Sequence, residues 1–129
     1  MVVCGAVAVA LACAGCGSAS NESARSVADQ FVSAVGSSDS QQACELLSPT
    51  TVEQLESSHP EGCEQALSSL DLPSDAVTEV RVWGDAAQAR TGGDVLFLRE
   101  LQDGWRVMAA GCQSPQDKSQ PYECELEGS

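Results

Sequence analysis

Apolar residues recur at every third or fourth position in the segment that follows residue 22. The members of this stripe are Ala24, Val27, Ala28, Phe31, Ala34 and Val35. Such spacing places them on one face of an amphipathic helix, and glycine is frequent just past a helix end. We therefore predict a helix that ends at Gly36 and carries Phe31 on its apolar face.

Three shorter helices are predicted next. The first covers residues 41–47. The second starts at Ser48-Pro49, because serine caps a helix and proline fits its first position, and it ends at His59. The third covers residues 61–70.

Beyond these helices the apolar period falls to two, which is typical of strands with one buried face. Four strands are predicted, over residues 76–83, 86–91, 94–101 and 105–111. In the first of them we expect Val80 and Val82 on one face, and Val77 and Trp83 on the other. The predicted fold class is α+β, with N-terminal helices packed on a curved antiparallel sheet of about four strands.

The first fifteen residues, MVVCGAVAVALACAG, carry no charge and are almost wholly apolar. This run is short for a membrane span and has the length of a signal-peptide core. With Ala14-Gly15 before Cys16, it resembles the bacterial lipoprotein signal. The resemblance implies cleavage before Cys16, acylation of that cysteine (palmitate-type chains), and a place on the extracytoplasmic face of the cell membrane. An ordinary secretory signal and a buried N-terminal helix are the alternatives.

Removal of that signal would leave four cysteines besides Cys16 in an exported domain. Four cysteines allow three pairings, and we favour the local one, Cys44 with Cys63 and Cys112 with Cys124. Each bridge closes a loop of about ten to twenty residues, which contributes about 3 kcal/mol in the chain-entropy model. A metal centre is the rival use of these cysteines. None of these four cysteines lies in a CxxC spacing, and the chain has one histidine, so we predict neither metal nor cofactor.

The net charge of the chain limits the classes of molecule that it is expected to bind. The 129-residue chain has 19 acidic and 6 basic residues, for a net charge of -13. Binding to nucleic acid needs a basic footprint that neutralises phosphates, so we exclude that role. The same charge opposes adsorption to anionic lipid, and membrane attachment must then be covalent or by insertion.

Two segments carry a family resemblance. Residues 80–112, VRVWGDAAQARTGGDVLFLRELQDGWRVMAAGC, are similar to the sheet half of small NTF2-like lipoproteins, and residues 43–55, ACELLSPTTVEQL, fit the helical half. The resemblance implies a sheet curled around the long helix as a cone, which is an apolar cavity in some members and filled in others. The expected organisation is a signal peptide over 1–15, a lipidated cysteine and flexible tether over 16–21, an NTF2-like domain over 22–112 and a disulfide-pinned tail over 113–129.

Candidate catalytic chemistry is sparse. Some members of this superfamily are isomerases, cyclases or dehydratases that place an Asp or a His in the cavity. His59 lies at a helix break and Asp94 begins a strand, which makes them weak candidates. For Asp94, no second titratable group stands at a spacing in the sequence that would shift the pKa of its carboxyl group. Five large side chains are expected either to fill the core or to line a pocket: Phe31, Trp83, Phe97, Trp105 and Met108.

These features predict a lipid-anchored extracytoplasmic module that binds a small apolar ligand or an envelope protein, and not an enzyme. The alternatives are a small acid-base enzyme of the isomerase or cyclase type and a ligand-free spacer. A pocket that holds a buried carboxylate or His59 would favour the enzyme. A cone plugged by Trp and Phe would favour a protein-interaction role.

Overall fold

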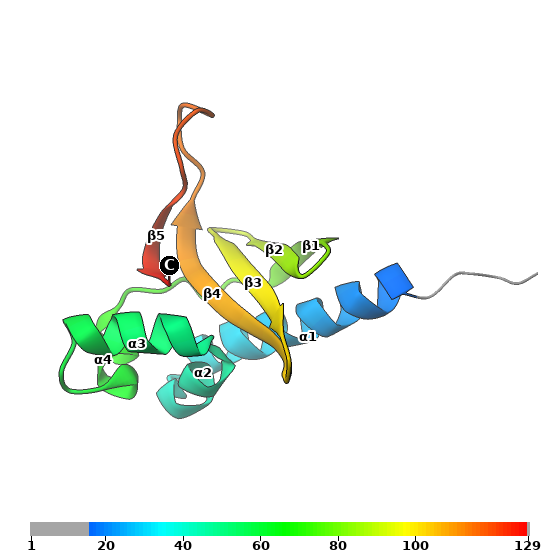
Figure 1. The fold of residues 1–129 in the computed structure, drawn as a ribbon. Coiled ribbons are helices and arrows are strands. Elements are labelled where there is room, and N and C mark those ends of the chain that lie inside the picture. The colour runs from blue at the N-terminus through cyan, green and yellow to red at the C-terminus, as the bar shows by residue number, and fades with distance from the viewer. Residues whose placement is uncertain (1–15, 129) are drawn as a thin grey trace, which may run out of the picture.

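The fold is α+β, as the change of apolar period predicts (Figure 1). A computed structural model describes the backbone of residues 16–128 and the side chains of residues 19–128. The elements are α1 (Cys16–Gly36), α2 (Ser40–Leu46), α3 (Pro49–Ser58), α4 (Cys63–Ser69), β1 (Val77–Trp83), β2 (Ala86–Thr91), β3 (Val95–Leu101), β4 (Gly104–Gln113) and β5 (Glu123–Glu127). The strands form one antiparallel sheet in the order β1-β2-β3-β4-β5. The expected signal peptide lies outside the described residues.

The short helices begin at side-chain caps. Asp39 caps α2 by accepting a hydrogen bond from the N–H of Gln42. Ser48 caps α3 by accepting from the N–H of Thr51, with Pro49 in the first helical turn, as the Ser-Pro pair predicts. The Thr51 hydroxyl also donates to the carbonyl of Met108 at 2.9 Å, so this cap ties α3 to β4.

Helix α1 begins at Cys16, which corrects the prediction of a flexible tether over residues 16–21. Two side chains on its first turns bind the edge of the sheet. The amide of Asn21 donates to the carbonyl of Val80 at 2.9 Å, and the guanidinium of Arg25 donates to that of Val77 at 3.0 Å. These bonds satisfy edge carbonyls of β1 that water would otherwise solvate, and they hold residues 21–25 of α1 against the edge of the sheet.

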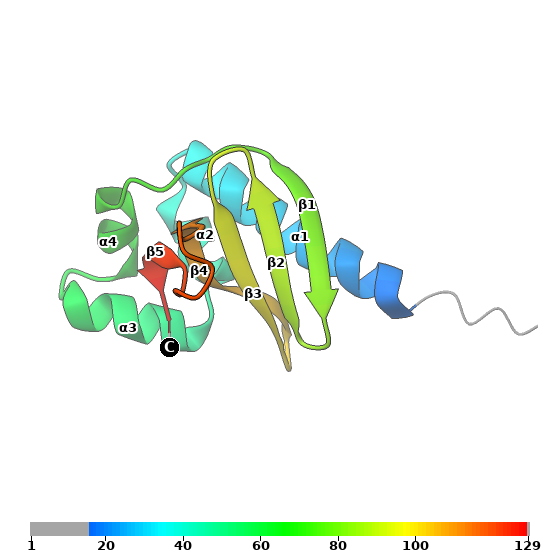
Figure 2. The same cartoon turned by 90° about the horizontal axis from the view of Figure 1, so that it is seen from above.

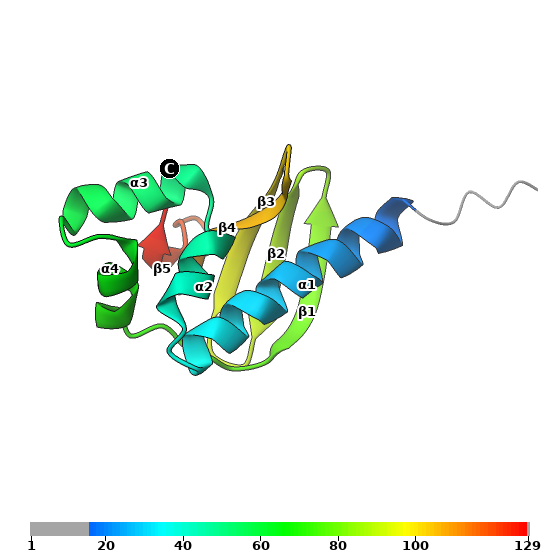
Figure 3. The same cartoon turned by 90° about the horizontal axis from the view of Figure 1, so that it is seen from below.

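The main core lies between α1 and the sheet. Phe31, Leu96 and Val107 are all at most 1 % exposed, and Trp105 is 3 % exposed. Figures 2 and 3 show the two faces of the sheet, with α1 crossing only one of them. Phenylalanine and tryptophan therefore occupy the space between helix and sheet, where the cone would hold its cavity.

The strand β1 departs from simple alternation. A β-bulge between Val77 and Glu79 resets the pairing with β2, and both Val77 and Val80 are buried. The prediction that Val77 faces away from Val80 is therefore wrong. An extra residue in one strand shifts the following side chains to the opposite face, which a period-two pattern does not anticipate.

The C-terminal tail contains a fifth strand, which the prediction of a loop over 113–129 missed. Strand β5 pairs with β4 and buries Leu126 against the main core. The two disulfides have the local pairing: Cys44 is bonded to Cys63 and Cys112 to Cys124. Cys112 and Cys124 are direct partners across β4 and β5, so this bridge joins the last strand to the sheet.

Candidate functional site

The face of the sheet opposite α1 carries an apolar groove of about 610 Å³. Its lining includes Trp83, Phe97, Arg99, Met108, Tyr122 and Glu127. The volume lies within the range of small-molecule sites, roughly 300 to 1,000 Å³, and aromatic and aliphatic side chains are the usual lining of such sites.

Strand register explains why the groove is hollow. Gln88, Phe97 and Ala109 are successive partners across β2, β3 and β4. Ala86 is the partner of Trp83 on one side and of Arg99 on the other. Each row thus places an alanine beside large side chains, Ala109 next to Phe97 and Ala86 between Trp83 and Arg99, and the missing side-chain volume gives the groove its depth.

Tyr122 forms one wall of the groove. Its ring meets that of Phe97 edge to face, with centroids 5.2 Å apart and planes at 78°. The amide of Gln88 donates to the Tyr122 hydroxyl at 3.3 Å. Hydrogen bonds with Ser114 and Gln88 hold the pKa of Tyr122 below its ordinary value. The Cys112–Cys124 bridge lies two residues along the chain and restrains the segment that carries this ring.

The five predicted core or pocket side chains divide between the two faces of the sheet. Phe31 and Trp105 belong to the core. Phe97 and Met108 are half-buried and line the groove, while Trp83 lines it with 56 % of its surface exposed. The core interpretation is therefore wrong for Trp83, because its place in register with Ala86 directs it to the face that α1 does not cover.

Asp94 is buried, yet it does not line the groove. Its carboxylate accepts hydrogen bonds from the Thr91 hydroxyl and, at 2.9 Å, from the N–H of Gly111. Gly111 has φ +65°, and a Cβ there would lie 3.0 Å from that of Glu125, so only glycine fits this bend of β4. Each carboxylate oxygen thus accepts a hydrogen bond that helps to order the local backbone. This arrangement is typical of an aspartate with a structural role.

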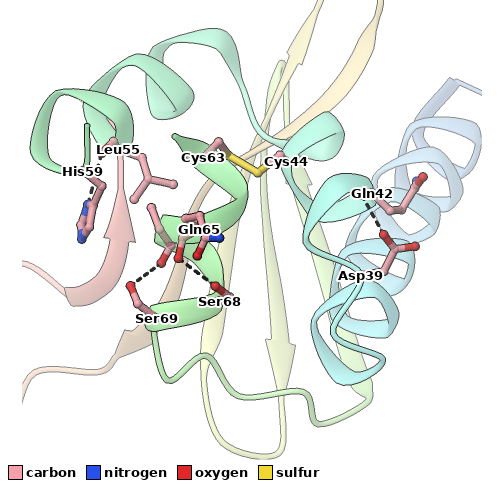
Figure 4. The surroundings of a disulfide bond; sticks show 10 residues. Asp39, Gln42, Cys44, Leu55, His59, Cys63, Gln65, Ser68 and Ser69 are labelled. Atoms are coloured by element: carbon pink, nitrogen blue, oxygen red, sulfur yellow. Dashed lines mark hydrogen bonds between the residues drawn. A yellow bond between two sulfur atoms is a disulfide. The ribbon is translucent and has the colours of Figure 1, made fainter. Parts of the chain in front are cut away.

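His59 lies elsewhere, at the end of α3. It is half-buried, and its Nδ1 lies 3.2 Å from the carbonyl of Leu55 (Figure 4). It lines a separate pocket of about 420 Å³ together with Glu125 and Glu127. Asp94 does not line this pocket, so the structure does not bring the two catalytic candidates together.

Within residues 16–128, no three or more His, Cys, Asp or Glu side chains gather in a metal-binding arrangement. Over the same range, no helix has both the length and the apolar character of a membrane span.

The groove contains two residues that sequence reasoning did not place in a site. Arg99 was recognisable only as a strand arginine, and Tyr122 as an aromatic residue of the tail. Pairing of β2 with β3 brings Arg99 beside Ala86, and the Cys112–Cys124 bridge brings Tyr122 over Phe97. The Pro-Tyr pair next to Cys124 was the available signal for the second of these.

Comparison with known proteins does not identify the chain: no family model matches it, and the searches of curated proteins and of solved structures found no match.

Proposed function

We propose that this protein is a membrane-anchored binding module of the cell envelope, whose site is the groove on the exposed face of the sheet. The observation that carries the proposal is the exposed aromatic wall. Trp83 keeps more than half of its surface in contact with water beside the half-buried Phe97 and Met108. Apolar side chains gathered around a groove are typical of a ligand or partner site.

The groove replaces the cone as the proposed binding site. Phe31 and Trp105 occupy the space between α1 and the sheet. This filling also favours an envelope protein as a second candidate occupant, one that would insert an apolar side chain between Trp83 and Tyr122. An acid-base enzyme has less support, because Asp94 uses both carboxylate oxygens in hydrogen bonds and His59 lines another pocket.

The groove is tested with N-phenyl-1-naphthylamine, a neutral apolar dye whose fluorescence rises in apolar surroundings. We expect the protein to bind it, and Trp83→Ala to weaken binding about tenfold, since loss of one aromatic wall in a site costs about 1.4 kcal/mol. Val52→Ala, which shortens a half-buried side chain of α3 outside the groove, is the matched control and should bind as the parent does. Equal binding by Trp83→Ala and the parent, or no binding by either, would contradict the proposal.

The anchor is proposed to be lipid on Cys16, and its support is the resemblance of residues 1–16 to a lipoprotein signal. Two acyl chains hold a protein firmly at a bilayer, whereas one binds reversibly. We expect Cys16→Ala to move the protein from the membrane to the soluble fraction in its bacterial host. Cys13→Ala, the neighbouring cysteine, should leave it at the membrane. Membrane retention of Cys16→Ala, with no lipid mass on the chain, would exclude this anchor.

Membership of the NTF2-like superfamily is likewise part of the proposal. Its support is the order of the elements, with a long helix and short helices followed by an antiparallel meander, and the crossing of one sheet face by α1.

A further inference from the structure

We infer that the ligand of this groove is an anionic amphiphile, whose acid group binds Arg99 and whose apolar body lies over Phe97 and Met108. This inference rests on the proposed function, and it specifies the chemical class of the ligand. The class includes free long-chain carboxylic acids, and it shares its headgroup chemistry with acidic membrane lipids.

The basic residues of the chain are gathered on the groove face. Four of the six occupy positions on that face of β1 to β4: Arg81, Arg90, Arg99 and Arg106. Residues 16–75, which form the helical layer, contain ten acidic residues and one basic residue, Arg25. Of these four arginines, Arg99 lines the apolar groove itself, and its charge is complementary to an anionic headgroup there.

Among these arginines, Arg99 is the one with donors to spare inside the groove. Its nearest carboxylate, that of Asp85, lies 3.7 Å away, and the two side chains are 51 % and 67 % exposed. An exposed pair of this kind contributes less than about 1 kcal/mol, so a ligand carboxylate can displace it.

Two other arginines on this face, Arg106 and Arg81, are more fully engaged. Arg106 donates to Asp103 at 2.7 Å and to the carbonyl of Trp105 at 2.9 Å. Arg81 donates to Glu79 at 2.9 Å, and it does not line the groove.

A carboxylate on β5 fixes the direction of the ligand. Glu127 lines the groove, and Ala109 is its partner on β4. Arg99 lies on β3, two strands away, in register with Ala86. An acid group placed beside Glu127 would be repelled, so the ligand must carry its acid group on the Arg99 side.

The test uses two amphiphiles of equal chain length and opposite charge, dodecanoate and dodecyltrimethylammonium, each below its micelle concentration. Calorimetry on the purified full-length chain should show dodecanoate binding more tightly by at least about tenfold, the gain expected from one charge-assisted hydrogen-bonding pair. The overall charge of -13 favours the cationic amphiphile at any non-specific site, which makes this order of affinity diagnostic.

Substitution of arginine locates the effect. Arg99→Gln should lower the affinity for dodecanoate about tenfold and remove the preference over the cation. Arg81→Gln, on the same face but outside the groove, is the matched control and should keep the preference. The binding heat of either amphiphile should fall with Trp83→Ala.

The outcomes separate this inference from the function on which it rests. Equal binding of the two amphiphiles, lost in Trp83→Ala, would overturn the anionic class and retain the groove. Binding of neither amphiphile, together with no binding of the neutral dye, would overturn both. Co-sedimentation with phosphatidylglycerol vesicles without binding of monomeric dodecanoate would also overturn the inference, because the acid group would then belong to a membrane surface.

Discussion

Replacement of Phe31 by alanine is expected to lower the free energy of unfolding by about 4 kcal/mol, the largest effect of any single substitution considered for this domain. The side chain is 1 % exposed and lies in the core between α1 and the sheet. Removal of the ring takes away its burial and leaves a cavity that the surrounding helix and strands can only partly close. Urea unfolding followed by far-ultraviolet circular dichroism, with the disulfides intact, measures the change.

The second phenylalanine of the chain is the matched control. Phe97 is half-buried on the opposite face, where its ring meets Tyr122. Phe97→Ala should cost about 1.5 kcal/mol, because water already reaches part of the ring. A similar loss of stability for the two variants would contradict the assignment of Phe31 to the core and Phe97 to the groove.

Replacement of Asp94 by alanine is expected to destabilise the domain by about 3 kcal/mol. The variant leaves the buried N–H of Gly111 without its acceptor, and it removes one of the two acceptors of the Thr91 hydroxyl. The loss of stability arises at the bend of β4 next to Cys112, where Gly111 has a positive φ. The same urea titration reports it.

Asp94→Asn separates a structural role from a catalytic one. Asparagine keeps an oxygen for the N–H of Gly111 and places an amide beside the Thr91 hydroxyl, so we expect a loss of only about 1 kcal/mol. A structural aspartate therefore gives a large cost for alanine and a small one for asparagine. Unfolding free energies within 1 kcal/mol of the parent for Asp94→Ala would show that the carboxylate does not order this bend.

Local sequence signals predicted most of the secondary structure. The end of α1 at Gly36, the start of α3 at Ser48-Pro49 and its end at His59 each depend on side chains within one helical turn. Cap hydrogen bonds and the restricted backbone of proline act over that range, and a single sequence displays them.

Features that depend on contacts between distant residues were missed. The early turns of α1 are held by the bonds of Asn21 and Arg25 to β1, more than fifty positions away. The alternation of Cys124 and Leu126 with glutamates looked like a polar tail, and it becomes β5 only when β4 supplies the partner. Such pairings need the assembled sheet.

Sequence reasoning selected several residues of the candidate site but did not predict their arrangement. Phe97, Met108 and Trp83 were correctly selected as notable side chains, but whether each faces the core or the opposite side depends on strand register. One bulge reverses the faces of the residues that follow it, and β1 contains one. Asp94 and His59 were selected for their chemistry, and the structure gives them separate surroundings.

The continuity of α1 determines how an attached lipid would govern the position of the domain. A helix rises about 1.5 Å per residue, so the five residues from Cys16 to Asn21 span roughly 8 Å before the first bond to β1. If Cys16 carries acyl chains, this rigid helical segment would pass any tilt of its membrane end on to the whole sheet. The groove would then keep a fixed distance from the bilayer and a fixed orientation relative to it. Amphiphiles that leave or enter the lipid are most concentrated in that region.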